Sequence, residues 1–125
     1  MISHLQVGVD VERIVPGFAW AGIATRFLSR AERLWIHGFP PAFQREAFFY
    51  CWTRREAYGK ACGTGITEDR PVRPGKDPAL VWQDDQPWCV RSFVPLDGHV
   101  AALAAAGSEW NVRFYDWHAG ALPQA

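Results

Sequence analysis

The stretch Leu5-Gln6-Val7-Gly8-Val9-Asp10-Val11-Glu12 alternates valines with a glycine and two acids. Successive side chains of a strand point to opposite faces, so this alternation predicts a strand with one apolar face. The other face carries Gly8, Asp10 and Glu12, and the two acids lie about 7 Å apart along the backbone. We therefore expect the fold to begin with a strand that presents two carboxylates on one side.

Helical patterns follow this strand. Ser29 and Glu32 have the spacing of a capping box, which predicts a short helix that ends at Gly38. A longer helix is predicted over residues 42–62, which contain no proline and are followed by Gly63 as a C-terminal cap. We therefore expect two helices between the first strand and the second half of the chain.

The second half of the chain has the pattern of a strand meander after a loop over residues 63–77. Strands between turn sequences are predicted over 79–83, 87–94, 100–106 and 110–117. The alanines of 100–106 also favour a helix, whereas the flanking turns favour a strand. This order predicts an α+β fold in which an antiparallel sheet packs against the long helix. We expect one domain over 1–118 and a frayed tail over 119–125.

Composition limits the class of protein. The 125 residues carry 13 basic and 13 acidic side chains, and this zero net charge argues against a nucleic-acid binder. No run of about 18 apolar residues occurs and residues 1–6 show no secretory signal, so we expect no membrane partner. Three scattered cysteines fit a reducing cytoplasm better than a disulfide framework, so we expect a cytoplasmic protein.

Two pairs of charged residues are candidates for chemistry. Asp10 and Glu12 repel each other on one strand face, and a hard divalent cation such as Mg²⁺ would neutralise them. Glu56 and Lys60 are spaced i,i+4 on the long helix, with the acid first. Taken singly, a solvated strand face and a surface ion pair are the simpler interpretations. The two pairs become informative only in combination.

Three sequence blocks resemble one family in order and spacing. They are Val7-Gly8-Val9-Asp10-Val11-Glu12, Phe27-Leu28-Ser29-Arg30-Ala31-Glu32 and Trp52-Thr53-Arg54-Arg55-Glu56-Ala57-Tyr58-Gly59-Lys60-Ala61. The chain resembles the 4'-phosphopantetheinyl transferase superfamily over nearly its whole length. The blocks are similar to the second lobe of the two-lobed, surfactin-synthetase-activating type, and the length is similar to that of the single-lobe holo-acyl-carrier-protein synthases.

The resemblance implies an enzyme that moves the 4'-phosphopantetheine arm of coenzyme A to a serine of an acyl or peptidyl carrier protein, releasing adenosine 3',5'-bisphosphate. It implies that Asp10, Glu12 and Glu56 hold Mg²⁺. It also implies that Glu56 takes the serine proton, directly or through a water, and that Lys60 neutralises phosphate charge. Arg55 stands where the family more often has lysine, as a cofactor-binding cation with a different shape. Phosphoryl transfer depends on positioning and charge neutralisation, which such groups supply.

The resemblance also implies partners. Coenzyme A lies between two lobes in the two-lobed type, and one lobe is recognised here. By analogy with the single-lobe synthases we expect a homo-oligomer, in which a second copy supplies the missing half of the cleft. The alternatives are a non-catalytic lobe that binds metal, carrier protein or a partner subunit without turnover, and a simple α+β interaction module. Arg26, Arg30 and Arg33 form either a solvated basic face or a surface for an acidic carrier protein.

Overall fold

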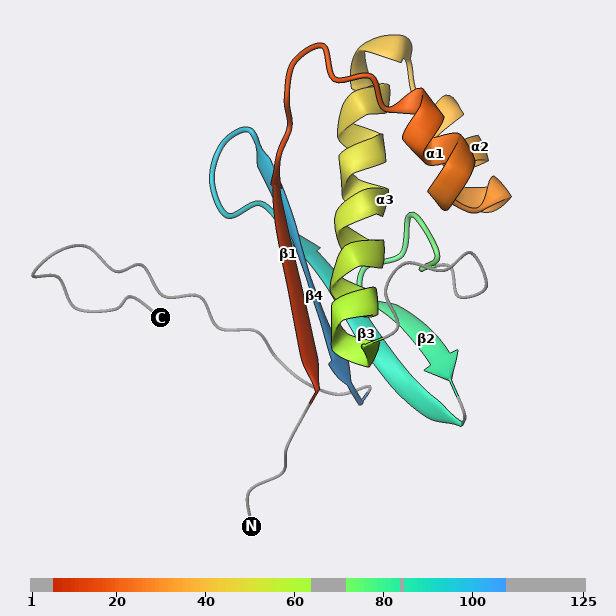
Figure 1. Ribbon diagram of the computed structural model, residues 1–125, viewed down its shortest axis with the longest axis vertical. Coiled ribbons are helices and arrows are strands. Elements are labelled where there is room, and N and C mark those ends of the chain that lie inside the picture. The colour runs from red at the N-terminus through yellow and green to blue at the C-terminus, as the bar shows by residue number, and fades with distance from the viewer. Residues whose placement is uncertain (1–5, 64–71, 84, 108–125) are drawn as a thin grey trace, which may run out of the picture.

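The computed structural model describes residues 6–63, 72–83 and 85–107. In this part of the chain, four strands form an antiparallel sheet in the order β1-β4-β3-β2, and α3 lies across one face of it (Figure 1). The elements are β1 (Val7–Arg13), α1 (Ala21–Phe27), α2 (Arg30–His37), α3 (Pro41–Cys62), β2 (Ala79–Gln83), β3 (Gln86–Phe93) and β4 (His99–Ala106). The predicted α+β fold is confirmed.

β1 lies at one edge of the four described strands and has two different faces. It pairs with β4 from Val7 opposite Ala105 to Arg13 opposite His99. The predicted alternation is present, because the three valines of β1 are about half exposed whereas Asp10 is buried. The acids of this strand therefore face α3, and its valines face away from the helix.

α3 begins and ends where the sequence indicates. Pro41 is its first residue, and Gly63 ends it in the left-handed conformation with φ of 72°. Its N-terminal half packs Phe48 and Phe49 into a cluster with α1 and α2, whereas Ala57 and Ala61 pack against the sheet. The helix therefore joins an aromatic core at one end to a sheet-facing surface of small residues at the other.

The structure adds a helix that the sequence does not predict. α1 spans seven residues, and no side chain caps its N-terminus at Trp20, so it carries no start signal. α2 follows the prediction: the Glu32 N–H donates to the Ser29 hydroxyl at 3.2 Å, and the Ser29 N–H donates to the Glu32 carboxylate at 3.0 Å. The count of helices between β1 and the meander is thus three instead of two.

The meander agrees with its prediction as far as it is described. β2, β3 and β4 lie within one residue of the predicted strands, and 100–106 belongs to a strand instead of a helix. The predicted strand over 110–117, the tail over 119–125 and residues 64–71 of the loop lie outside the described residues, and the single domain over 1–118 stays a prediction. None of the described helices is long and apolar enough to cross a membrane.

Candidate active site

β1 touches α3 at Gly8. A Cβ atom on this residue would lie 2.0 Å from the carbonyl oxygen of Ala57 and 2.4 Å from the backbone nitrogen of Ala61. Strand and helix backbones can approach this closely only because residue 8 has no side chain. The approach places the next two residues on the same face of β1, Asp10 and Glu12, beside the C-terminal half of α3.

An ion pair crosses from α3 to β1 at this place. The Nζ atom of Lys60 lies 2.9 Å from Oδ1 of Asp10 and 3.3 Å from the carbonyl oxygen of Val9. The side chain of Asp10 is 8% exposed, whereas that of Lys60 is 53% exposed. The two predicted charged pairs, one on the strand and one on the helix, therefore meet at one site.

The other two acids belong to the same site, and we call Asp10, Glu12 and Glu56 the acid cluster. Burial raises the pKa of Glu12, and the charge of Asp10, a hydrogen bond with Asp10 and the charge of Glu56 raise it further. Burial and the charge of Asp10 also raise the pKa of Glu56. Lys60 acts against both shifts. Three carboxyl groups thus repel one another beside a single ammonium group.

The acid cluster has the chemistry of a site for a hard cation. It offers oxygen ligands, which Mg²⁺ prefers, and Oδ2 of Asp10 is buried without a hydrogen-bond donor. Within residues 6–63, 72–83 and 85–107, no three Asp, Glu, His or Cys side chains are grouped closely enough to hold a metal ion. The donor types fit Mg²⁺, and the acids have to draw together to share it.

Arg55, the predicted cofactor contact, lies between α3 and α2. Its Nε donates to Oε1 of Glu32 at 2.7 Å, and its Nη2 lies 2.6 Å from the same oxygen. Arg55 is 3% exposed and Glu32 is 0% exposed. The pair therefore holds the capped start of α2 against α3, a role that the sequence analysis did not assign. The contact between Arg55 and coenzyme A stays a prediction.

Arg54 is a buried cation that the sequence analysis missed. Its guanidinium lies 4.7 Å from the ring centroid of Tyr50, and its Nη1 donates to the Ser92 hydroxyl at 2.7 Å. Its Nη2 donates to the carbonyl oxygen of Lys76, and Asp77 lies 3.4 Å from Nη1. Arg54 therefore fastens the segment before β2 to the helix that carries Glu56 and Lys60. The available signal was the pair of adjacent arginines in the middle of the helix.

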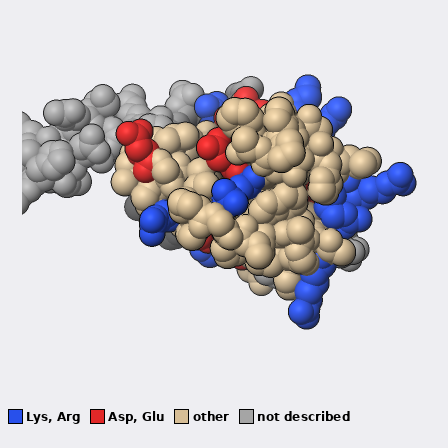
Figure 2. All heavy atoms as spheres, turned by 90° about the horizontal axis from the view of Figure 1, so that it is seen from above, with Lys and Arg blue, Asp and Glu red and all other residues tan. Residues whose placement is uncertain are grey.

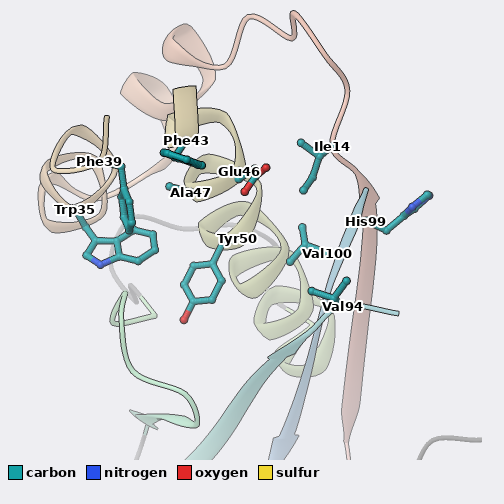
Figure 3. Close-up of a pocket in the computed structure, with 10 residues that line it drawn as sticks. All are labelled: Ile14, Trp35, Phe39, Phe43, Glu46, Ala47, Tyr50, Val94, His99 and Val100. Atoms are coloured by element: carbon teal, nitrogen blue, oxygen red, sulfur yellow. The ribbon is translucent and has the colours of Figure 1, made fainter. Parts of the chain in front are cut away.

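A separate apolar hollow of about 320 Å³ opens beside the N-terminal half of α3. Figure 3 shows aromatic side chains of α2 and α3 on one side of it and aliphatic side chains of the sheet end on the other. Glu46, Tyr50 and His99 are its titratable groups, and no member of the acid cluster lines it. The hollow and the acid cluster are therefore different places on the same helix.

Comparison with known proteins agrees with this fold. The family model described as the 4'-phosphopantetheinyl transferase superfamily (ACPS) matches residues 6–104, a span that includes the acid cluster and Lys60. The chain belongs to the 4'-phosphopantetheinyl transferase superfamily.

Two curated relatives and one solved structure are similar to the chain. The 4'-phosphopantetheinyl transferase HetI of Nostoc sp. (strain PCC 7120 / SAG 25.82 / UTEX 2576) is 33% identical over 115 residues, which are 90% of this chain and 48% of HetI. The 4'-phosphopantetheinyl transferase gsp of Aneurinibacillus migulanus is 37% identical over 65 residues, which are 52% of this chain and 27% of gsp. The crystal structure of Thermotoga maritima holo-[acyl-carrier-protein] synthase (AcpS) shares the fold, with a TM-score of 0.59 and 22% identity over 83% of this chain and 64% of that one. The chain spans about half the length of HetI.

Proposed function

We propose that this chain transfers the 4'-phosphopantetheine arm of coenzyme A to a serine of an acyl or peptidyl carrier protein. The observation that carries the proposal is the meeting of Lys60 with the acid cluster where β1 crosses α3. Membership of the superfamily supports it, and HetI and gsp are both named 4'-phosphopantetheinyl transferases. The serine oxygen forms a bond to the phosphorus that carries pantetheine, the pyrophosphate bond breaks, and adenosine 3',5'-bisphosphate leaves.

The residues of the site have distinct roles in this proposal. Glu56, directly or through a water that it orients, takes the proton of the serine hydroxyl. Asp10, Glu12 and Glu56 would hold Mg²⁺, which supplies charge neutralisation at the pyrophosphate. The half-exposed Lys60 would bind phosphate oxygens at the rim of the site.

We also propose that a second copy of the chain supplies the other half of the coenzyme A cleft. The sheet face away from α3 exposes Val7, Val9 and Val11 of β1, each at least 45% exposed, and Leu80 and Trp82 of β2. The register of the four strands puts Val7 and Leu80 in one row across the sheet. Exposed apolar side chains suit association between copies. This face lies on the opposite side of the sheet from the acid cluster, so it supports an oligomer and not the position of the second half of the cleft.

The basic side chains of α1 and α2 suit contact with a carrier protein that has an acidic surface. Arg26 and Arg30 are exposed, and Arg33 donates to the carbonyl oxygen of Leu28 at 2.8 Å. Figure 2 shows basic side chains projecting from the side of the molecule on which α1 and α2 lie in Figure 1. Opposite charge on a partner would steer its approach to this side.

A transfer assay tests the function. The protein is incubated with Mg²⁺, coenzyme A and an apo carrier protein, and the carrier is analysed by mass spectrometry. The expected result is a carrier that has gained the mass of the phosphopantetheine arm. Carriers of the fatty-acid, polyketide and nonribosomal-peptide types that all stay unmodified would reject the proposal and favour a lobe that binds without turnover.

A further inference from the structure

Lys60 lies where a cation is needed when no metal is bound. Its ammonium contacts a carboxylate oxygen of Asp10 at 2.9 Å and the carbonyl oxygen of Val9 at 3.3 Å. Carboxylate and carbonyl oxygens are also ligands of hard divalent cations. The ammonium therefore occupies one oxygen of the carboxylate group that a metal ion at the acid cluster would bind.

The charges around Lys60 explain why it takes this position. Asp10 is almost fully buried, and its charge raises the pKa of both Glu12 and Glu56. The hydrogen bond with Asp10 and the charges of all three acids also raise the pKa of Lys60, so its ammonium stays charged. Without Lys60, three mutually repelling carboxyls would remain with one buried oxygen already lacking a donor.

Only one member of the ion pair is able to move away. Asp10 lies on a strand that is paired with β4 and pressed against α3 at Gly8. Lys60 lies on the last turns of α3, and its flexible side chain is 53% exposed. Any exchange of cations at Asp10 therefore moves Lys60 and leaves Asp10 in place.

We propose that Lys60 is the resident cation of the metal-free site and leaves Asp10 when a divalent cation binds. A dication and an ammonium on one carboxylate group repel each other strongly at such short range. Departure from Asp10 turns the ammonium toward solvent, where it is available to phosphate oxygens. The inference rests on the proposed function for the identity of the metal. It adds a metal-free state in which Lys60 pairs with Asp10, and the proposed chemistry alone does not require that state.

Lysine NMR tests the exchange directly. The chain contains two lysines, Lys60 and Lys76, so the ¹⁵N-labelled ammonium spectrum has two signals, and a Lys76→Arg variant assigns them. Titration with Mg²⁺ alone, without coenzyme A or carrier, should shift the signal of Lys60 and leave that of Lys76 in place. A Lys60 signal that stays unchanged at high Mg²⁺ concentration, or a protein that binds no Mg²⁺, would overturn the inference.

Metal affinity provides a matched test by titration calorimetry with Mg²⁺ alone. Lys60→Met should bind Mg²⁺ tighter by about threefold or more, because no ion pair has to be broken first. Arg13→Met removes the same charge from an exposed residue on the other face of β1 and should change the affinity by less than about twofold. Equal gains in both variants would show that net charge alone sets the affinity, which would overturn the exchange. An exchange observed in a protein without transfer activity would reject the proposed function and leave this inference intact.

Discussion

Gly8 and Asp10 are two positions apart on one strand face, and the site depends on both. Gly8 lets the backbone of β1 lie against Ala57 and Ala61, and the close approach brings Asp10 within reach of Lys60. A glycine in a strand ordinarily weakens it, so its presence here is explained by the helix that crosses it. The residues that perform chemistry are thus positioned by a residue that has no side chain.

Replacing Gly8 should separate the strand from the helix. Gly8→Ala places a methyl group inside the backbone of α3, so we expect the free energy of unfolding to fall by about 1–3 kcal/mol or more. The melting temperature should fall by about 4–8 °C for each kcal/mol. Gly22→Ala is the matched control, because a Cβ at this position of α1 meets no atom within 4 Å. A Gly8→Ala variant as stable as Gly22→Ala would contradict the close approach.

Removing Asp10 should stop transfer without unfolding the protein. Asp10→Ala deletes the acid that contacts Lys60 and takes away little core volume, so we expect transfer to fall by about a thousandfold or more. Circular dichroism should remain that of the folded protein. Glu46→Gln, an acid of α3 outside the cluster, should retain the transfer rate. An unchanged rate in Asp10→Ala would show that the proposed metal ligands are wrong.

The raised pKa of Glu56 predicts a pH-dependent stability difference. The folded protein holds this proton more tightly than the unfolded chain, so ionisation of Glu56 lowers stability as the pH rises above its ordinary value of 4.5. In metal-free buffer, Glu56→Gln should therefore melt at a higher temperature than the wild type at about pH 7. The difference should shrink as the pH falls below about 4.5, where the wild-type carboxyl is protonated in both states. A wild type that melts higher than the variant near neutral pH would contradict the cause given for the shift.

At the scale of elements, α2 is fixed by one carboxylate with two tasks. Glu32 accepts the Ser29 N–H in the capping box, and it also accepts from the buried guanidinium of Arg55 on α3. A capping residue usually acts only within its own helix, whereas this one also sets where α2 docks. α1 and α2 therefore keep a fixed position beside the N-terminal half of α3.

Replacement of Glu32 should lower the free energy of unfolding more than most substitutions in the chain do. Glu32→Ala removes the cap and the carboxylate that pairs with the buried guanidinium of Arg55, so we expect a loss of about 3–5 kcal/mol in urea unfolding. Glu46→Gln, an exposed acid on α3, should change stability by less than about 0.5 kcal/mol. Arg55→Lys keeps a charge opposite Glu32 and should lose less than Arg55→Met. If Glu32→Ala changes the free energy of unfolding by less than about 1 kcal/mol, as a surface substitution does, the pair of Glu32 and Arg55 does not stabilise the fold.

At the scale of the whole molecule, the two faces of the sheet differ, because α3 packs against one of them (Figure 1). The face under α3 holds the acid cluster and a buried apolar core, whereas the other face exposes the valines of β1 together with Leu80 and Trp82. The acid cluster and the exposed apolar side chains thus lie on opposite faces of the same sheet. Association through that face is the physical basis of the proposed oligomer.

Light scattering measures this association. The expected mass is a multiple of the 14.1 kDa chain, and Val9→Glu should shift the protein toward the monomer because it charges the exposed sheet face. Leu34→Glu is the matched control, since Leu34 is 60% exposed on α2, away from that face. A monomeric wild type with full transfer activity would contradict the proposed second copy.

Local signals in the sequence determined most of the elements. The alternation of β1, the capping box of α2, and Pro41 and Gly63 at the ends of α3 all act through neighbouring backbone, so their spacing alone predicts them. α1 has no such signal, and its seven residues are held by packing in the aromatic cluster around Phe48. The choice of a strand for 100–106 was also correct, because its turns outweighed the helix propensity of its alanines.

Which charged groups meet was decided by the tertiary structure. Spacing alone predicted Asp10 with Glu12 and Glu56 with Lys60 as separate pairs, and it could not say that Lys60 would bind Asp10. Nor could it distinguish Arg55, which turns inward to Glu32, from a ligand-binding cation. Contacts between distant segments depend on where α3 crosses the sheet. That crossing is set by the close packing of α3 against Gly8, and no local pattern of the sequence predicts this packing.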